Sequence, residues 1–128
     1  MTLKPDARAF LPLTPLSFQV LLALADTERH GYGIIREVDE RTDGVIRLRT
    51  GTLYTLLHRL LEQSLIEAAE PDSSGAGRRD ATGKDDPRRR YYALTLLGRA
   101  VVRAEAQRLA RVVVEARRKR VLGRESKA

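Results

Sequence analysis

The chain has 128 residues, of which 42% are apolar, so its length and composition predict one small domain with one modest core. The absence of cysteine excludes disulfides, thiolate metal sites and thiol nucleophiles. The formal charge of +7 is uneven, because residues 1–71 carry eight basic and ten acidic side chains whereas residues 72–128 carry sixteen and seven. This basic second half favours a polyanionic partner, with a solvated basic helix as the alternative.

Patterns typical of metal sites, enzymes and membrane proteins are absent from the sequence. The two histidines, His30 and His58, lie outside any H-x-x-H or H-E-x-x-H spacing, so we expect no metal site and no cofactor. Paired carboxylates and nucleophile–base sets do not stand out, so we expect no enzyme. The N-terminus has an acid and two prolines where a signal peptide needs an apolar core, and the longest apolar run, 20–25, cannot span a bilayer. We therefore expect a cytoplasmic protein.

The first half of the chain predicts two helices joined to a third by short turns. Thr14 and Pro15 are a typical cap and first residue of a helix that should run to about Ala25. Apolar residues surround this helix, which indicates burial on two sides, one of them against another subunit. After a polar turn at 26–30, a second helix should begin at the glycines of G-Y-G and end near Gly44. Residues 45–48 then read as an extended link or a minor strand.

Residues 49–66 predict an amphipathic third helix, with Thr50 as its cap. Five leucines at positions 53, 56, 57, 60 and 61 recur at the spacing that places them on one buried side. The opposite side collects polar residues, and Gly51 leaves the backbone open where the positive end of the helix would meet an anion. Two helices joined by a short turn that contains glycine predict a helix-turn-helix.

The periodicity then changes to two, which predicts a hairpin of two strands near 66–69 and 91–94. The polar residues 72–88 between them read as a flexible tip. Thr95 should cap a long helix that reaches about Leu122, ahead of a frayed tail at 123–128. An a/d rhythm along this helix favours a dimer seam over ordinary packing within the domain; its residues are Val102, Ala106, Leu109, Val113 and Ala116.

These elements predict a mainly α-helical fold with a small β-hairpin, namely a winged helix-turn-helix at 14–95, between an N-terminal arm at 1–13 and a dimerisation helix at 96–122. The sequence also resembles the PadR family of bacterial transcriptional regulators, in its short-tail branch with a single C-terminal helix. The resemblance covers about Leu13 to Val114 and rests on H-G-Y-G-I at 30–34, G-T-L-Y with L-x-R-L at 51–60, S-L-I at 64–66 and R-Y-Y-A-L-T-x-x-G at 90–98. The chain departs from the family pattern at Thr55, where proline is common, at Ser64, where glycine is common, and in its long wing tip.

Helix-turn-helix proteins insert the N-terminal part of the third helix into the major groove, so we expect DNA contacts before the carboxylate of Glu62. Tyr54 is equally suited to a phosphate contact and to packing under the wing, and His58 is either a contact residue or no more than a solvated surface histidine. The arginines that enter the second wing strand suit the phosphate backbone or the minor groove, and this reading is favoured over a solvated charge run. The predicted DNA-binding residues are Thr50, Gly51, Thr52, Tyr54, Thr55, His58, Arg59, Arg88, Arg89 and Arg90.

We therefore predict a homodimeric, sequence-specific DNA-binding repressor that binds an inverted repeat, with Phe18 and Leu22 joining the seam residues at the dimer interface. The alternative is a winged helix that binds proteins without sequence-specific DNA binding. The resemblance further implies release by a small-molecule effector between the dimer helices and the winged core, lined by Phe18, Leu22 and Val102. Arg117 to Arg120 read as a solvated tail.

Overall fold

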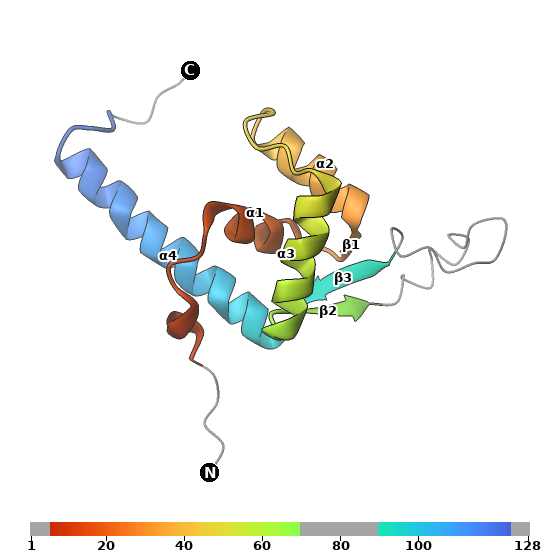
Figure 1. Cartoon of the computed structure of the whole chain (residues 1–128). Coiled ribbons are helices and arrows are strands. Elements are labelled where there is room, and N and C mark those ends of the chain that lie inside the picture. The colour runs from red at the N-terminus through yellow and green to blue at the C-terminus, as the bar shows by residue number, and fades with distance from the viewer. Residues whose placement is uncertain (1–5, 70–89, 124–128) are drawn as a thin grey trace, which may run out of the picture.

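The computed structural model describes residues 6–69 and 90–123 of the chain (Figure 1). It is mainly helical with one small antiparallel sheet and a long C-terminal helix, as the sequence predicts. In chain order the elements are η1 (Ala7–Phe10), α1 (Pro15–Ala23), β1 (Arg29–His30), α2 (Gly31–Arg41), α3 (Thr50–Glu62), β2 (Ile66–Ala69), β3 (Tyr91–Leu94) and α4 (Leu96–Arg118).

Threonine side chains begin two of the helices, and both caps were predicted. The Thr14 hydroxyl accepts a hydrogen bond from the Ser17 N–H at 3.1 Å, and the Thr95 hydroxyl accepts one from the Gly98 N–H at 2.9 Å. Each bond satisfies an N–H that lacks a partner in the first helical turn. The prediction for Thr50 was wrong, because Thr50 is the first residue of α3 and the capping position is Arg49, which makes no side-chain cap bond.

The ends of two helices also differ from the prediction. Helix α1 ends at Ala23 and α4 ends at Arg118, short of the expected Ala25 and Leu122. The link at 45–48 forms no strand. By contrast, the end of the predicted polar turn is a strand, since Arg29 and His30 pair with Tyr92 and Tyr91 of β3.

The sheet has the strand order β1-β3-β2, so the predicted hairpin is confirmed and gains a short third strand. Ile66 pairs with Leu94 and Ala69 with Tyr91 across the hairpin. The predicted wing tip at 72–88 lies outside the described residues.

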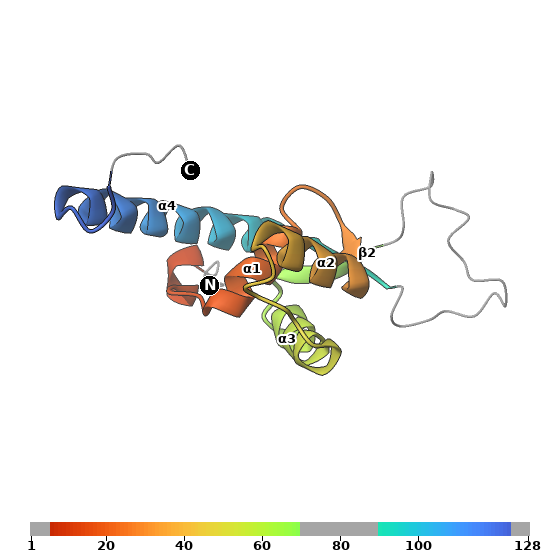
Figure 2. The ribbon, with the colours of Figure 1, turned by 90° about the horizontal axis from the view of Figure 1, so that it is seen from above.

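The core forms where α1, α2 and α3 meet α4 and the base of the wing. Its fully buried members include Leu21 of α1, Ile34 of α2, Leu53 of α3 and Val101 of α4. Four of the five leucines of α3 are buried, and Leu61 is half-buried against the same cluster. Viewed from above, α4 and α3 lie at opposite edges of the molecule with α1 between them (Figure 2). This arrangement leaves one whole side of α3 free.

A buried carboxylate fastens the N-terminal segment to α4. Glu105 is only 2% exposed, and its carboxylate accepts the Leu13 N–H at 2.9 Å and two hydrogen bonds from Arg108, at 2.5 and 3.1 Å. The Arg108 hydrogen bond holds the pKa of the Glu105 carboxyl below its ordinary value, against the opposing effect of burial. Within the predicted N-terminal arm, η1 and Leu13 therefore pack along α4.

None of the helices within residues 6–69 and 90–123 combines the length and the apolar character that crossing a bilayer requires.

Candidate nucleic-acid interface

Helix α3 presents a polar surface that no other described element covers. Its buried stripe is formed by leucines, and the opposite side is solvent-exposed from the capping residue onward. An added Cβ at Gly51 would meet no atom within 4 Å, so the backbone is open there. The exposed members of this surface are Arg49, Thr50, Gly51, Thr52, Thr55, His58 and Arg59. The structure thus places six of the predicted contact residues on one side of one helix.

Tyr54 behaves differently from its neighbours on α3. It is half-buried, and its hydroxyl oxygen lies against the backbone of Gly31 at the start of α2. Of the two roles weighed for this residue, packing is the one that its position favours, and the backbone that it approaches is that of Gly31 in α2.

The C-terminal half of the polar surface contains a carboxylate, that of Glu62. His58 Nε2 lies 3.7 Å from Glu62 Oε2, and both side chains are largely exposed. The carboxylate would repel DNA phosphates, so the electrostatically favourable part of α3 is its N-terminal part together with Arg59.

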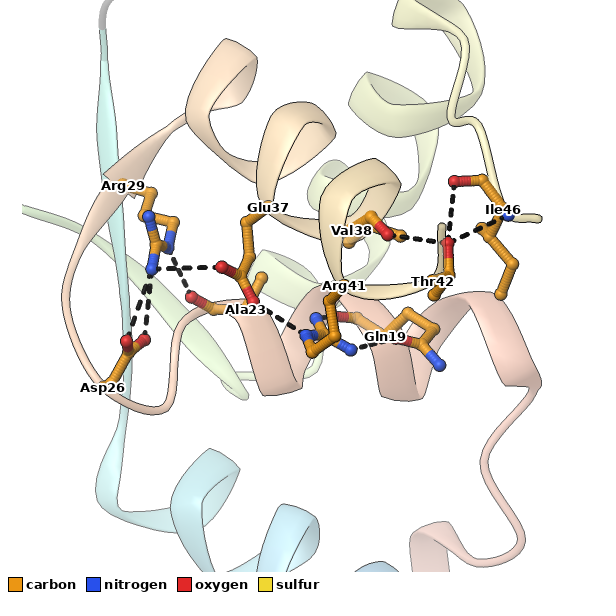
Figure 3. A network of polar contacts seen from close by, with 9 residues as sticks. All are labelled: Gln19, Ala23, Asp26, Arg29, Glu37, Val38, Arg41, Thr42 and Ile46. Atoms are coloured by element: carbon orange, nitrogen blue, oxygen red, sulfur yellow. Dashed lines mark hydrogen bonds and ion pairs between the residues drawn. The ribbon is translucent and has the colours of Figure 1, made fainter. Parts of the chain in front are cut away.

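Polar contacts hold α2, and with it the turn before α3, onto α1 (Figure 3). Arg29 donates to the Ala23 carbonyl at 2.7 Å and lies 3.6 Å from Glu37. Glu37 in turn pairs with Arg41 at 2.7 Å, and Arg41 also hydrogen bonds to the side chain and the carbonyl of Gln19. Arg29 and Arg41 both contact residues of α1, so the network fixes the position of α2 relative to α1. Helix α3 follows α2 in the chain and is positioned by it.

The turn between α2 and α3 is closed by Thr42. Its hydroxyl donates to the Val38 carbonyl at 2.8 Å and accepts the Ile46 N–H at 3.1 Å (Figure 3). Asp43 and Gly44 both have positive φ, which reverses the chain direction. This turn therefore sets where α3 begins.

Of the three predicted wing arginines, only Arg90 belongs to the described residues; Arg88 and Arg89 lie outside them. Arg90 is exposed and directly precedes β3, beside the buried Tyr92. Burial raises the pKa of the Tyr92 hydroxyl, and the Arg90 charge lowers it by a smaller amount. The phenol therefore stays neutral at physiological pH, and Arg90 is a cation at the base of the wing.

The predicted dimer residues occupy different environments. Val102 is 7% exposed and belongs to the core of its own chain. Phe18, Leu22, Leu109 and Ala116 are half-buried, whereas Ala106 is exposed and Val113 is 39% exposed. The stripe of α4 that packs on its own domain is Gly98, Val101, Val102 and Glu105, so the predicted seam runs beside this stripe and overlaps it at Val102.

Three residues of the surroundings were missed from the sequence. Arg47 and Arg49 flank the start of α3 and are exposed, and Arg47 lies 3.6 Å from Asp39. A count of basic residues just before the helix would have found both arginines. Glu105 could have been found from the sequence, because it falls at the helical spacing of the buried residues of α4 and Arg108 follows three residues later. Within the described residues, no group of three or more histidine, cysteine, aspartate or glutamate side chains is arranged to hold a metal ion.

Helices α1 to α3, the wing and the exposed polar side of α3 define a winged helix-turn-helix protein. The model of the transcriptional regulator PadR-like family matches residues 20–104, and the chain belongs to this family. This result confirms the resemblance recognised in the sequence.

Individual relatives agree with the family assignment. An uncharacterized protein of Lysinibacillus sphaericus is 32% identical over 81 residues, which are 63% of this chain and 65% of that protein; the chain thus spans slightly less than two thirds of that relative. The H. salinarum RosR chain in the complex structure of hsRosR-S4 is 32% identical with a TM-score of 0.61, and the match covers 91% of this chain and 90% of that chain. A PadR family transcription regulator from Clostridium difficile R20291 shares the fold at 24% identity and a TM-score of 0.65, with 86% and 100% of the two chains covered.

Proposed function

We propose that this protein is a sequence-specific DNA-binding transcriptional repressor that binds an inverted-repeat operator as a homodimer. The observation that carries this proposal is the uncovered N-terminal part of α3, which is polar, free of carboxylates before Glu62 and rigidly backed by buried leucines. A helix of this kind fits the major groove. Family membership among transcriptional regulators supports the same role.

Each exposed residue of α3 suits a particular contact. Thr50 and Gly51 lie in the first turn, where unpaired N–H groups attract a backbone phosphate. Thr52 and Thr55 offer hydroxyl and methyl groups to base edges, and Arg59 suits a guanine or a phosphate. Arg90 at the wing base, and the neighbouring Arg88 and Arg89, would contact the backbone beside the groove.

Dimerisation is supported by apolar surface that the described part of this chain leaves uncovered. Val112 is about half exposed on α4, and Val113 of the predicted seam is 39% exposed. Leu16 of α1 is 37% exposed, and Phe18 and Leu22 nearby are half-buried. We propose that the partner subunit packs on α1 and on the seam residues of α4. Two α3 helices would then enter successive major grooves about 10 bp apart.

Selection from a random duplex pool by the purified chain tests the function. We expect sequencing to return an inverted repeat, and the affinity for it to fall steeply between about 50 and 200 mM salt because several phosphates are neutralised. A winged helix that serves only protein contacts would enrich no sequence, and that result would overturn the proposal. Analytical ultracentrifugation of the same sample should show a dimer.

A further inference from the structure

The outer side of α4 carries a line of cations that the recognition surface does not use. From Leu96 to Arg120 there are eight basic side chains and two glutamates. Both glutamates are paired within the helix, Glu105 with Arg108 and Glu115 with Arg118. Across residues 6–69 and 90–123, no carboxylate lies within salt-bridge distance of Arg99, Arg103, Arg111 or Arg117; we name these four the arginine row.

The arginine row lies along one exposed side of the helix. At 100° per residue its members fall within about 120° of one another and point away from the buried stripe that contains Val101 and Glu105. All four are exposed, and only Arg99 is tethered, through a hydrogen bond to the Ala25 carbonyl at 3.1 Å. With a rise of 1.5 Å per residue, the row is about 27 Å long.

This side of α4 cannot reach the DNA that α3 would read. Helices α4 and α3 lie at opposite edges of the molecule, with α1 between them (Figure 2). Arg103 and Arg111 are also turned away from the proposed dimer seam, at about 80–160° around the helix from Leu109 and Val113, whereas Arg99 and Arg117 lie within about 80° of these two residues. The row is therefore a second cationic surface that faces away from the first.

We propose that the arginine row binds the phosphate backbone of a second DNA segment, so that the protein can bridge two duplexes. A row of cations beside which the one neighbouring carboxylate, Glu115, is already paired with Arg118 complements an extended polyanion, and duplex DNA carries about one negative charge per 1.7 Å of its axis. A membrane is a poorer fit, since the broad apolar side that surface binding requires is turned into the protein core here. This inference rests on the proposed function, which would bring DNA to the other side.

A two-duplex capture assay tests the bridging. The full chain is loaded onto an immobilised duplex that it has selected, and retention of a fluorescent random duplex is then measured at about 50 mM salt. We expect the wild type to retain the second duplex and Arg103→Gln/Arg111→Gln to retain at least tenfold less at equal loading. The matched control Arg8→Gln/Arg36→Gln removes two exposed arginines elsewhere and should retain it as the wild type does.

Equal retention by the two double variants, or none by the wild type, would overturn the bridging proposal. Retention of poly-glutamate through the row, without retention of the duplex, would also overturn it and assign the surface to an acidic protein. Failure of the proposed function gives a different result, because the wild-type chain would then not bind the immobilised duplex at all. In that case, binding of random duplex to Thr55→Glu protein is compared with and without the row substitutions. A tenfold loss supports the row, and no change overturns it.

Discussion

A Cβ atom placed on Gly31 would lie 2.6 Å from the hydroxyl oxygen of Tyr54. Gly31 begins α2 and Tyr54 belongs to the first half of α3, so this approach brings the two helices of the helix-turn-helix together at one point. Since real Cβ contacts are longer than this, only glycine allows α3 to pack so closely at residue 31. The H-G-Y-G and G-T-L-Y motifs are thereby explained as two sides of one contact.

Gly31→Ala should lower the stability of the protein by about 1–3 kcal/mol, because the tyrosine ring must move away from α2. Tyr54→Phe removes the oxygen at the closest approach, so the double variant should be destabilised by less than the sum of the two single changes. Urea unfolding of all four proteins measures this coupling. Strictly additive changes would show that the contact does not constrain residue 31.

Gly98→Ala should be more damaging, because its Cβ would lie 1.9 Å from the backbone carbonyl oxygen of Leu65. That carbonyl also accepts the Thr95 N–H at 3.1 Å, so the start of α4 is held against the backbone of the residue that precedes β2. We expect a loss of about 3 kcal/mol or more, since a backbone atom cannot rotate aside. Gly51→Ala is the matched control, in open space, and should leave the melting temperature equal or slightly higher. Equal effects at the two glycines would contradict this account.

Ser64→Gly should stabilise the chain. Ser64 has φ +62° and follows the end of α3, where the Leu65 N–H donates to the Leu60 carbonyl at 3.0 Å and the Ser64 N–H donates to that of Leu61 at 3.0 Å. This is the glycine-favouring geometry of a helix C-terminus, so the family pattern is kept although the residue differs. Removal of the side chain should gain about 1 kcal/mol, which thermal unfolding can detect. Gln63→Gly, at φ −81°, should instead destabilise.

Glu105 should make stability depend on acid pH. Its hydrogen bonds from Arg108 lower the pKa of the carboxyl in the folded state, so its contribution is complete above the pKa of the unfolded state and is lost as the pH falls through the folded value. Glu105→Gln should cost about 1–3 kcal/mol near neutrality. The gap in unfolding free energy between the wild type and this variant should shrink below about pH 4.5, the ordinary value for glutamate. A gap that stays constant into that range would contradict the assignment. Glu67→Gln, on the exposed side of β2, serves as a control.

The elements that followed from the sequence are those determined by local patterns. Leucine spacing located α3, and threonine caps located the starts of α1 and α4, because both signals act within a few residues. Strand β1 was not predicted, since Arg29 and His30 form a strand only by pairing with β3, some sixty residues later. The cap at Thr50 failed for a similar reason, because the turn closed by Thr42 sets where α3 begins.

The motif residues that make contacts within the fold are different from the residues of the candidate DNA-binding site. His30 accepts the Gly33 N–H at 3.0 Å and packs edge-on against Tyr91, with ring centroids 5.4 Å apart, so it joins α2 to the wing. The remaining motif residues in contact, Gly31 with Tyr54 and Leu65 with Gly98, likewise hold the fold. The residues proposed to read DNA lie on the exposed side of α3, between the motif residues in the sequence. Packing within the protein does not restrict which amino acids can stand at these exposed positions. Sequence patterns could therefore locate the surface but not its specificity.

The central claim is that the free side of α3 binds DNA. Fluorescence anisotropy with the selected duplex compares Thr55→Glu and Arg59→Ala with Thr27→Glu, an equal change in the exposed turn before β1. We expect Thr55→Glu and Arg59→Ala to weaken binding at least tenfold at an unchanged melting temperature. Thr55→Glu places a carboxylate beside the phosphates, and Arg59→Ala removes a cation that attracts them. Thr27→Glu should bind as the wild type does. Unchanged affinity in both α3 variants would contradict the claim.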